Sequence, residues 1–203
     1  MLRIFGRVSS INVRKVLWCC AELAIPYTRE DWGAGFRSTS DEKFLKLNPN
    51  GLVPVIDDDG FVLWQSNSIL RYLAASAPEL YPPEPRKRAM VDQWIDWQAT
   101  ELNDAWRYAF MNLVRRSPEH QDAKLRERSL AQWSRMMELL DVQLSATGGH
   151  VAGQAFTLAD IPVGLSVHRW YSTPMARPDL RSVAAYYQRL KDRPAFTKLM
   201  TDP

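Results

Sequence analysis

Two segments of the chain place polar side chains where a helix is expected to begin. Gln65 and Ser66 directly follow the apolar run Phe61–Trp64 and open Ser66–Leu73, whose composition predicts a helix. The first N–H groups of a helix have no partner inside the helix, and the positive end of its dipole favours an anion. The pair therefore predicts a place where backbone N–H groups and a hydroxyl bind an anionic group.

The second segment is a polar turn that precedes a predicted amphipathic helix. It contains Ser9, Ser10 and Asn12, and the basic residues Arg14 and Lys15 follow within the helix. Ser10 and Asn12 are both good N-cap residues, so the turn on its own favours a capping role.

The elements that position these segments have an α/β order. Strands are predicted at Leu2–Gly6, Pro26–Glu30, Val53–Ile56 and Phe61–Trp64, and helices at Asn12–Ala24, Asp41–Leu47 and from Ser66 onward. Pro54 cannot donate to a sheet ladder and belongs at a strand start or on an edge, and Asp58-Asp59-Gly60 supplies hairpin turn chemistry. The order β-α-β-α-β-β-α predicts a thioredoxin-like domain with a mixed sheet.

The rest of the chain is predicted to be helical. Four prolines within residues 78–85 predict a stiff linker. Helices are then expected over 86–116, 119–144, 158–171, 180–191 and 195–200. Thr157 and Asp160 have the spacing of a capping box. We therefore expect a thioredoxin-like domain at 1–77, the linker at 78–85 and an all-α domain at 86–203.

The composition excludes several classes of protein. Of 203 residues, 46% are apolar and 24% charged, as in ordinary soluble proteins, and the net charge of +3 is carried by scattered arginines rather than by a nucleic-acid-binding stripe. The longest apolar run, Val16–Ile25, contains Glu22 and is too short for a membrane span. Cys19 and Cys20 are adjacent, so a relaxed disulfide between them is unfavourable. No metal-ligand spacing occurs, and a reducing, cytoplasmic location is expected.

The Val-Pro strand, the hairpin and the Gln-Ser pair together resemble the glutathione-binding half of the glutathione transferase family. The Thr157–Asp160 box is similar to the helix cap in the second domain of that family. The resemblance covers the whole chain. It implies the thioredoxin-like plus all-helical fold, glutathione as co-substrate, a homodimer, and a cis peptide bond before Pro54.

The resemblance also implies that a hydroxyl in the first turn stabilises the thiolate of glutathione. A free thiol has a pKa of ~8.5, and a donor at a helix N-terminus favours the ionised form. Ser10, four residues before Arg14, is the first candidate, Ser9 is the alternate, and Asn12 could give a second hydrogen bond. The turn contains no cysteine, in contrast to cysteine-type transferases and to glutaredoxins.

Three parts of glutathione have candidate partners by the same resemblance. The main chain of Val53 beside Pro54 would bind the cysteinyl part, and Gln65 and Ser66 would bind the γ-glutamyl end. An acid of the partner subunit, Glu101 or Asp104, could contact the α-amino group, with a solvated helix face as the alternative.

The glycyl carboxylate has a less clear partner. The places where serine-type members carry a basic residue hold Thr39, Ser40 and Leu52 here, so Arg37 is the nearest substitute.

A hydrophobic electrophile is expected in the second domain. Trp106, Arg107 and Phe110 supply aromatic groups and a cation at helical spacing, and the alternative is that the aromatic stripe belongs to the core.

The expected function is that of a cytoplasmic, serine-type glutathione transferase that conjugates glutathione to a hydrophobic electrophile, as in detoxification. A glutathione-dependent isomerase is one alternative, because Ser9-Ser10 with Arg14 is similar to the Ser-Ser turn of the zeta class, although the cysteine of that turn is absent. A non-catalytic binding module is another, but it has no need of Pro54, Gln65 and Ser66 together.

Overall fold

The computed structural model describes residues 1–200 and divides the chain into two compact units. The first unit comprises Met1–Pro82 and the C-terminal segment from Ala195, and the second comprises the residues between them. The sequence pattern alone predicts that C-terminal segment to be part of the helical domain. The structure differs because Phe196, on helix α9 (Pro194–Leu199), packs against the buried Trp18, with ring centroids 4.9 Å apart.

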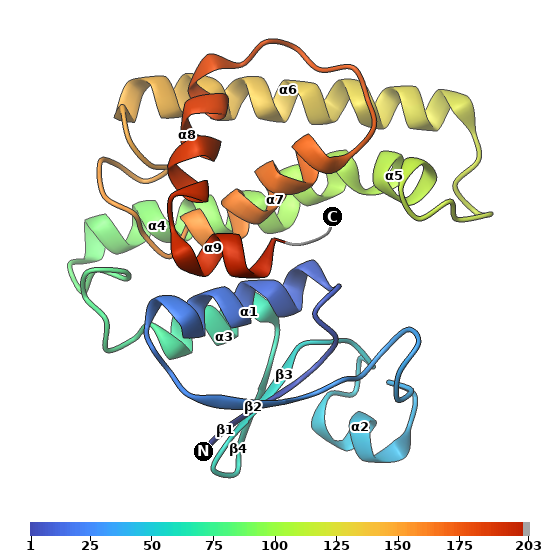
Figure 1. Ribbon diagram of the computed structural model, residues 1–203, viewed down its shortest axis with the longest axis vertical. Coiled ribbons are helices and arrows are strands. Elements are labelled where there is room, and N and C mark those ends of the chain that lie inside the picture. The colour runs from blue at the N-terminus through green and yellow to red at the C-terminus, as the bar shows by residue number, and fades with distance from the viewer. Residues whose placement is uncertain (201–203) are drawn as a thin grey trace. The chain divides into compact units, whose positions relative to one another are not determined.

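The first unit has the predicted order of strands and helices (Figure 1). Its elements are β1 (Leu2–Phe5), α1 (Ile11–Glu22), β2 (Tyr27–Glu30), α2 (Glu42–Leu47), β3 (Val55–Asp58), β4 (Phe61–Trp64) and α3 (Ser66–Leu73). The strand order is β2-β1-β3-β4, with β1 parallel to β2 and the other two pairs antiparallel. This mixed sheet confirms the predicted thioredoxin-like layout.

Side chains alternate along the strands and give the sheet two buried faces. Leu2 and Ile4 of β1 are buried. Figure 1 shows α1 and α3 together on one face of the sheet. Phe5 points to the other side, where it joins Trp32, Phe44 and Val55 in a second apolar cluster. Phe44 and the partly buried Leu47 both come from α2, so two apolar side chains hold this short helix against the sheet.

The hairpin β3–β4 brings the two ends of the candidate site together. Asp59 and Gly60 have φ values of +48° and +95°, as a two-residue type I′ turn requires. In the resulting register Val55 lies opposite Trp64. Pro54 and Gln65, which flank that pair in the sequence, therefore lie at the same end of the hairpin.

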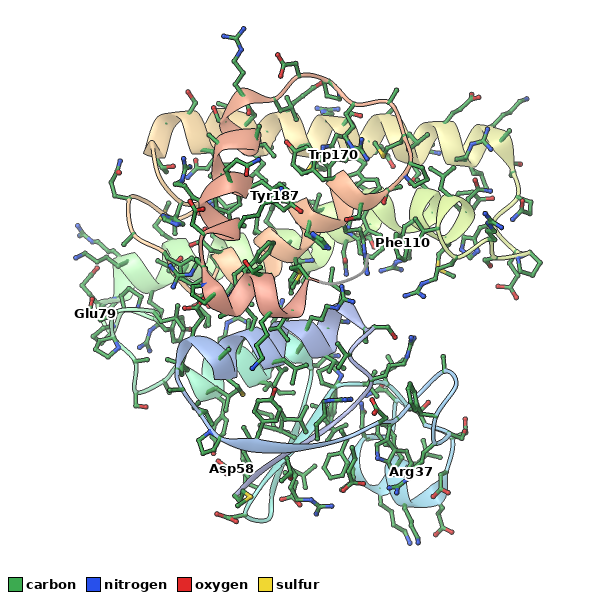
Figure 2. The ribbon with its side chains drawn as sticks, in the orientation of Figure 1. Arg37, Asp58, Glu79, Phe110, Trp170 and Tyr187 are labelled. Carbon is green, nitrogen blue, oxygen red and sulfur yellow. The ribbon has the colours of Figure 1, made fainter. Side chains whose placement is uncertain are left out.

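The second unit is helical. Its elements are α4 (Pro85–Trp97), the π-helix η1 (Gln98–Leu102), α5 (Asn103–Leu113), α6 (Ala123–Thr147), α7 (Asp160–Ser172) and α8 (Arg181–Lys191). The first three form one continuous helix, as predicted over 86–116, except that η1 adds a wide turn. Trp133 lies between Trp106 and Trp170 in the core, with centroid distances of 6.3 and 5.0 Å, and Figure 2 shows Trp170 among these helices.

Asp160 is fully buried at the start of α7 and binds more groups than a capping box requires. One carboxylate oxygen accepts from the main-chain N–H of Thr157 at 2.7 Å and from its hydroxyl at 3.2 Å. The other accepts from the N–H of Val151 at 3.0 Å and from the hydroxyl of Tyr186 at 2.9 Å. The acid half of the predicted box is therefore present, whereas the Asp160 N–H binds the Thr157 carbonyl instead of its hydroxyl.

Both cysteines of α1 are fully buried and reduced. Burial raises the pKa of Cys19 strongly and raises the pKa of Cys20 to about 12, because a thiolate is poorly solvated inside the protein. Neither thiol is therefore a nucleophile near neutral pH. Within residues 1–200, no helix combines the length and the apolar character needed to cross a bilayer.

Candidate functional site

The Val53–Pro54 peptide bond is cis, as predicted. It lies next to a small pocket in the first unit. The pocket is lined by Asn12, Asn48, Asn50, Leu52, Val53, Pro54, Gln65 and Ser66. Five of the residues singled out from the sequence, namely Asn12, Val53, Pro54, Gln65 and Ser66, thus share one pocket.

The Gln65–Ser66 pair forms the wall contributed by α3. Gln65 is the N-cap of α3 and has a φ of +72°, which is uncommon for a residue with a side chain. Ser66, the first helical residue, is 7% exposed, and its hydroxyl donates to the Asn12 amide oxygen at 3.3 Å. This bond joins the beginnings of α1 and α3, so the N-terminal ends of two helices meet at the pocket.

The opposite wall is a loop shaped by amide side chains. The Asn48 amide donates to the Leu52 carbonyl at 2.7 Å, and its oxygen accepts from the main-chain N–H and the side chain of Asn50. Asn48 is 2% exposed, so its hydrogen bonds are buried. They fix the conformation of the loop that precedes Val53. No local sequence pattern assigns Asn48, Asn50 or Leu52 to the pocket.

The first turn offers hydroxyl groups in different surroundings. Ser10 is the N-cap of α1, yet across the described chain its hydroxyl makes no capping bond to the helix. The Ser9 hydroxyl accepts a hydrogen bond from the Arg7 guanidinium at 2.8 Å. Neither serine lines the pocket, whereas Asn12, the second residue of α1, does.

The basic residues of α1 support this turn. Arg14 is 4% exposed and donates through Nε to the Val8 carbonyl at 2.9 Å. Lys15 is 2% exposed and donates to the Asn67 side chain of α3 at 3.1 Å. Arg14 therefore stabilises the turn, and Lys15 connects α1 with α3 beside the pocket.

Arg37 lies on the loop before α2 (Figure 2), where its partners are Glu30 and Trp32. Its guanidinium forms an ion pair with Glu30 at 2.8 Å and lies over the Trp32 ring at 5.5 Å. Hydrogen bonding by Arg3, with a smaller contribution from the charge of Arg37, lowers the pKa of Glu30 and keeps it ionised. Arg37 does not line the pocket.

The residues singled out in the second unit fall into two groups. Trp106 and Phe110 are buried, and the Arg169 guanidinium lies 4.4 and 4.0 Å from their ring centroids. Arg107 points outward and forms an ion pair with Asp104 at 3.1 Å. Of the three residues, Trp106 and Phe110 therefore belong to the core, and Arg107 belongs to the surface.

Glu101 lies on η1 beside a large groove of the second unit. The groove runs between α4–η1 and α6. Its apolar lining includes Trp94, Trp97, Leu139 and Val142. A hydrogen bond from the Thr100 hydroxyl lowers the pKa of Glu101, which therefore carries a negative charge at neutral pH.

Comparison with known proteins decides the family. A family model described as the N-terminal domain of glutathione S-transferase matches residues 9–76. The glutathione S-transferase GstB of Escherichia coli K12 is 34% identical, covering 100% of this chain and 99% of the relative. The chain belongs to the glutathione S-transferase family.

Solved structures agree with this assignment over the full chain. The theta class glutathione S-transferase of Xanthomonas axonopodis pv. citri, determined with glutathione bound, is 37% identical, with a TM-score of 0.93 and coverage of 100% of this chain and 98% of that one. A glutathione S-transferase from Pseudomonas fluorescens is 27% identical, covering 96% of each chain with a TM-score of 0.85. The chain is therefore a transferase. Its fold is the one predicted from its sequence.

Proposed function

We propose that this transferase conjugates glutathione to a hydrophobic electrophile. The observation that carries the proposal is the pocket in which cis-Pro54, the α3 N-terminus and the α1 residue Asn12 meet. The glutathione-bound structure of the Xanthomonas relative supports glutathione as the co-substrate.

The γ-glutamyl end would occupy the α3 wall of the pocket. The carboxylate of that end would accept hydrogen bonds from the first N–H groups of α3, and the helix dipole would favour its charge. The Ser66 hydroxyl, which has one hydrogen, would give up its bond to Asn12 to donate to the same carboxylate. The Gln65 side chain would bind the same group. The main chain of Val53 lies just outside the β3 ladder, which starts at Val55. It would pair with the cysteinyl part as one more extended strand.

The thiol would then lie at the first turn of α1. Ser10 is the leading donor to the thiolate because its hydroxyl is at the helix N-terminus and is not used for capping. Ser9 and Asn12 are the alternates. Ionisation releases the thiol proton to solvent, the sulfur forms a bond to the electrophilic carbon, and a leaving group departs with the electron pair of its own bond.

The second unit would supply the electrophile pocket. Of the three residues expected there, Arg107 has the exposed side chain, while Trp106 and Phe110 would act through the packing of α5. A pocket beside aromatic core residues suits a hydrophobic substrate.

We also propose a homodimer in the cytoplasm. The groove between α4–η1 and α6 exposes Val142 and Leu139, with exposures of 71% and 44%, and a second copy would cover these side chains. Glu101 beside that groove would then be available to the α-amino group of glutathione in the partner subunit. The buried thiols of Cys19 and Cys20 agree with a reducing compartment.

Retention on immobilised glutathione, followed by turnover of a generic aryl halide such as 1-chloro-2,4-dinitrobenzene, tests the proposal. Binding with elution by free glutathione and steady formation of the conjugate are expected. Failure to bind glutathione would refute the proposed function, and binding without turnover of any electrophile in a panel would favour a binding module.

A further inference from the structure

One buried side chain of α6 is hydrogen-bonded to the main chain of α5, the helix beside it (Figure 1). Ser129 is 5% exposed. Its hydroxyl donates to the Ala105 carbonyl at 2.6 Å and accepts from the Ala109 N–H at 3.1 Å. The single hydrogen of this hydroxyl and one of its lone pairs are therefore both used in the contact between the two helices.

The two α5 groups that Ser129 binds are a pair that an α-helix joins directly. In an α-helix each N–H bonds the carbonyl four residues earlier, which for Ala109 is the carbonyl of Ala105. The Ser129 hydroxyl therefore competes for the donor and the acceptor of one helical hydrogen bond. A side chain that enters this ladder bends a helix at the turn concerned. Ser129 thus influences the path of α5 over residues 105–109.

The same turn carries the residues expected at the electrophile pocket. Trp106 and Arg107 lie within it, and Phe110 directly follows Ala109. The rings of Trp106 and Phe110 meet edge to face, with centroids 5.5 Å apart. A change in the path of α5 at this turn would move both rings and the exposed Arg107 together.

The two rings are also packed against the neighbouring helices. Trp133 of α6 lies one helical turn after Ser129, on the same buried face, with its ring centroid 6.3 Å from that of Trp106. The guanidinium of Arg169, on α7, lies 4.4 Å from the Trp106 centroid and 4.0 Å from the Phe110 centroid. Because interiors are closely packed, the position of the α5 turn decides how these rings fit.

We propose that Ser129 is a positioning residue for the electrophile pocket. Its hydroxyl sets the bend of α5 that places Trp106, Arg107 and Phe110, and Ser129 itself touches neither glutathione nor the electrophile. The inference rests on the proposed conjugation of a hydrophobic electrophile at these residues. It predicts that the hydroxyl affects the selectivity of the second unit and leaves the binding of glutathione in the first unit unchanged.

Ser129→Ala removes the hydroxyl in a way that the fold can accommodate. The Ala105 carbonyl and the Ala109 N–H can then bond each other, as in an ordinary helix, so neither group is left buried without a partner. Ser129→Cys is a second variant, because a thiol has a similar shape but is a weak donor and a weak acceptor. It should show a smaller change in the same direction as Ser129→Ala.

The affinities of glutathione and S-hexylglutathione test the inference without turnover. Both ligands contain the same tripeptide, and the hexyl group on sulfur takes the place of the electrophile. By calorimetry, the wild-type enzyme should bind S-hexylglutathione at least about tenfold more tightly, because part of the alkyl chain becomes buried. Ser129→Ala should reduce this preference by at least about threefold and leave the affinity for glutathione within about twofold of wild type.

Steady-state kinetics separate positioning from a loss of folded enzyme. Ser129→Ala should raise the KM for 1-chloro-2,4-dinitrobenzene by about threefold or more and leave the KM for glutathione unchanged, since misplacement by ~1 Å can cost as much as about 100-fold. A smaller folded fraction would instead lower the apparent kcat and leave both KM values as they are. That second pattern would overturn the inference.

Thr147→Val is the matched control, because it also removes a hydroxyl from α6. The Thr147 hydroxyl donates to the Leu144 carbonyl of its own helix at 3.3 Å. This variant should keep the wild-type preference for S-hexylglutathione. An equal loss of preference in Thr147→Val and Ser129→Ala would assign the effect to α6 in general and overturn the role of Ser129.

The other outcomes are also decisive. An unchanged preference in Ser129→Ala, or equal weakening of both ligands, would overturn the positioning role and leave the proposed function intact. A wild-type enzyme that binds neither glutathione nor S-hexylglutathione would refute the proposed function itself.

Discussion

The three donor candidates of the first turn differ in what already occupies their polar atoms. The Asn12 amide oxygen accepts from Ser66, and the Ser9 hydroxyl oxygen accepts from Arg7, while the Ser10 hydroxyl is not used to cap α1. A residue that donates to a thiolate needs a hydrogen atom that is free to point at sulfur. Accepting a bond does not use the hydrogens of Ser9 or Asn12, so these hydrogen bonds do not separate the three candidates, and Ser10 stays the first candidate because it is the N-cap of α1.

Ser10→Ala should raise the pKa of enzyme-bound glutathione by about one unit or more, since ~1.4 kcal/mol corresponds to one unit. Turnover should fall more than affinity because the hydroxyl favours the ionised thiol rather than the bound tripeptide. Thiolate absorbance of the complex as a function of pH measures the shift.

Ser9→Ala and Asn12→Ala are the matched variants for this experiment. If the wild-type shift survives Ser10→Ala and disappears in one of these two, the donor is that neighbour. A bound thiol with the pKa of free glutathione in the wild-type enzyme would exclude activation by any residue of the turn.

Local motifs made part of the pocket predictable from the sequence. Pro54, Gln65 and Ser66 follow one another across a single hairpin, so their proximity follows from the turn at Asp59-Gly60. Asn48 and Asn50 could not be assigned in this way, because their role depends on side-chain hydrogen bonds within a loop. Such bonds form only once the rest of the unit fixes both ends of the loop.

At the scale of elements, Asp160 is a junction between α7, α8 and the loop before α7. Asp160→Ala would leave the N–H groups of Val151 and Thr157 and the Tyr186 hydroxyl buried without an acceptor. We expect a loss of about 3 kcal/mol in unfolding free energy, from unsatisfied groups that each cost about 1–3 kcal/mol. Urea denaturation measures it, and glutathione affinity of the folded variant should not change.

Asp41→Ala is the control for Asp160→Ala, because Asp41 is an exposed N-cap of α2 that accepts one bond, from the Lys43 N–H at 2.8 Å. It should cost about 1 kcal/mol, the usual value for a cap. Equal losses in the two variants would show that Asp160 is an ordinary cap rather than a junction.

The buried thiols of α1 predict a loss of stability at alkaline pH. The pKa of Cys20 is raised from 9.0 to about 12 by burial, so its contribution is complete below pH 9 and is lost as the pH rises toward 12. Above pH 9 the unfolded chain releases a proton that the folded chain keeps, which lowers stability by up to about 1.4 kcal/mol per pH unit. Urea midpoints at two pH values, one near neutrality and one above 9, measure this loss.

Cys20→Ala should lose less stability between those two pH values than the wild type does. Val16→Ala shortens another buried side chain of α1 and keeps both thiols, so it should show the full alkaline loss. An identical alkaline loss in Cys20→Ala and Val16→Ala would assign the effect to other titrating groups.

Periodicity and turn residues predicted the existence of most elements, and two deviations have physical causes. The π-helix η1 keeps helical backbone angles at both ends, with φ and ψ near −60° and −40°, so no breaker residue marks it. Gln98 stabilises it through a buried bond to the Ser166 hydroxyl at 3.0 Å. The placement of α9 in the first unit depends on the contact of Phe196 with Trp18, which no local pattern can reveal.

At the scale of the whole molecule, the proposed dimer predicts that α6 contributes to the interface between the two copies. Val142→Asp puts a charge into the apolar groove, where a second copy would have to bury it, and should convert the dimer to a monomer. Light scattering coupled to size-exclusion chromatography over a range of concentrations measures the mass.

Leu125→Asp is the matched variant, because Leu125 is an exposed apolar residue of the same helix outside the groove. It should remain dimeric. A wild-type mass that stays monomeric at every concentration would remove the proposed role of Glu101 from a partner subunit.

The packing of α9 against α1 also sets the order of events during synthesis. Trp18 and Phe196 are almost completely buried, yet the ribosome makes the entire second unit between them. At about 5–20 residues per second, Trp18 waits about 10–35 s for its partner ring. The first unit therefore emerges first and is completed last. During that interval an aromatic surface of α1 is open to chaperones, although the finished protein never exposes it.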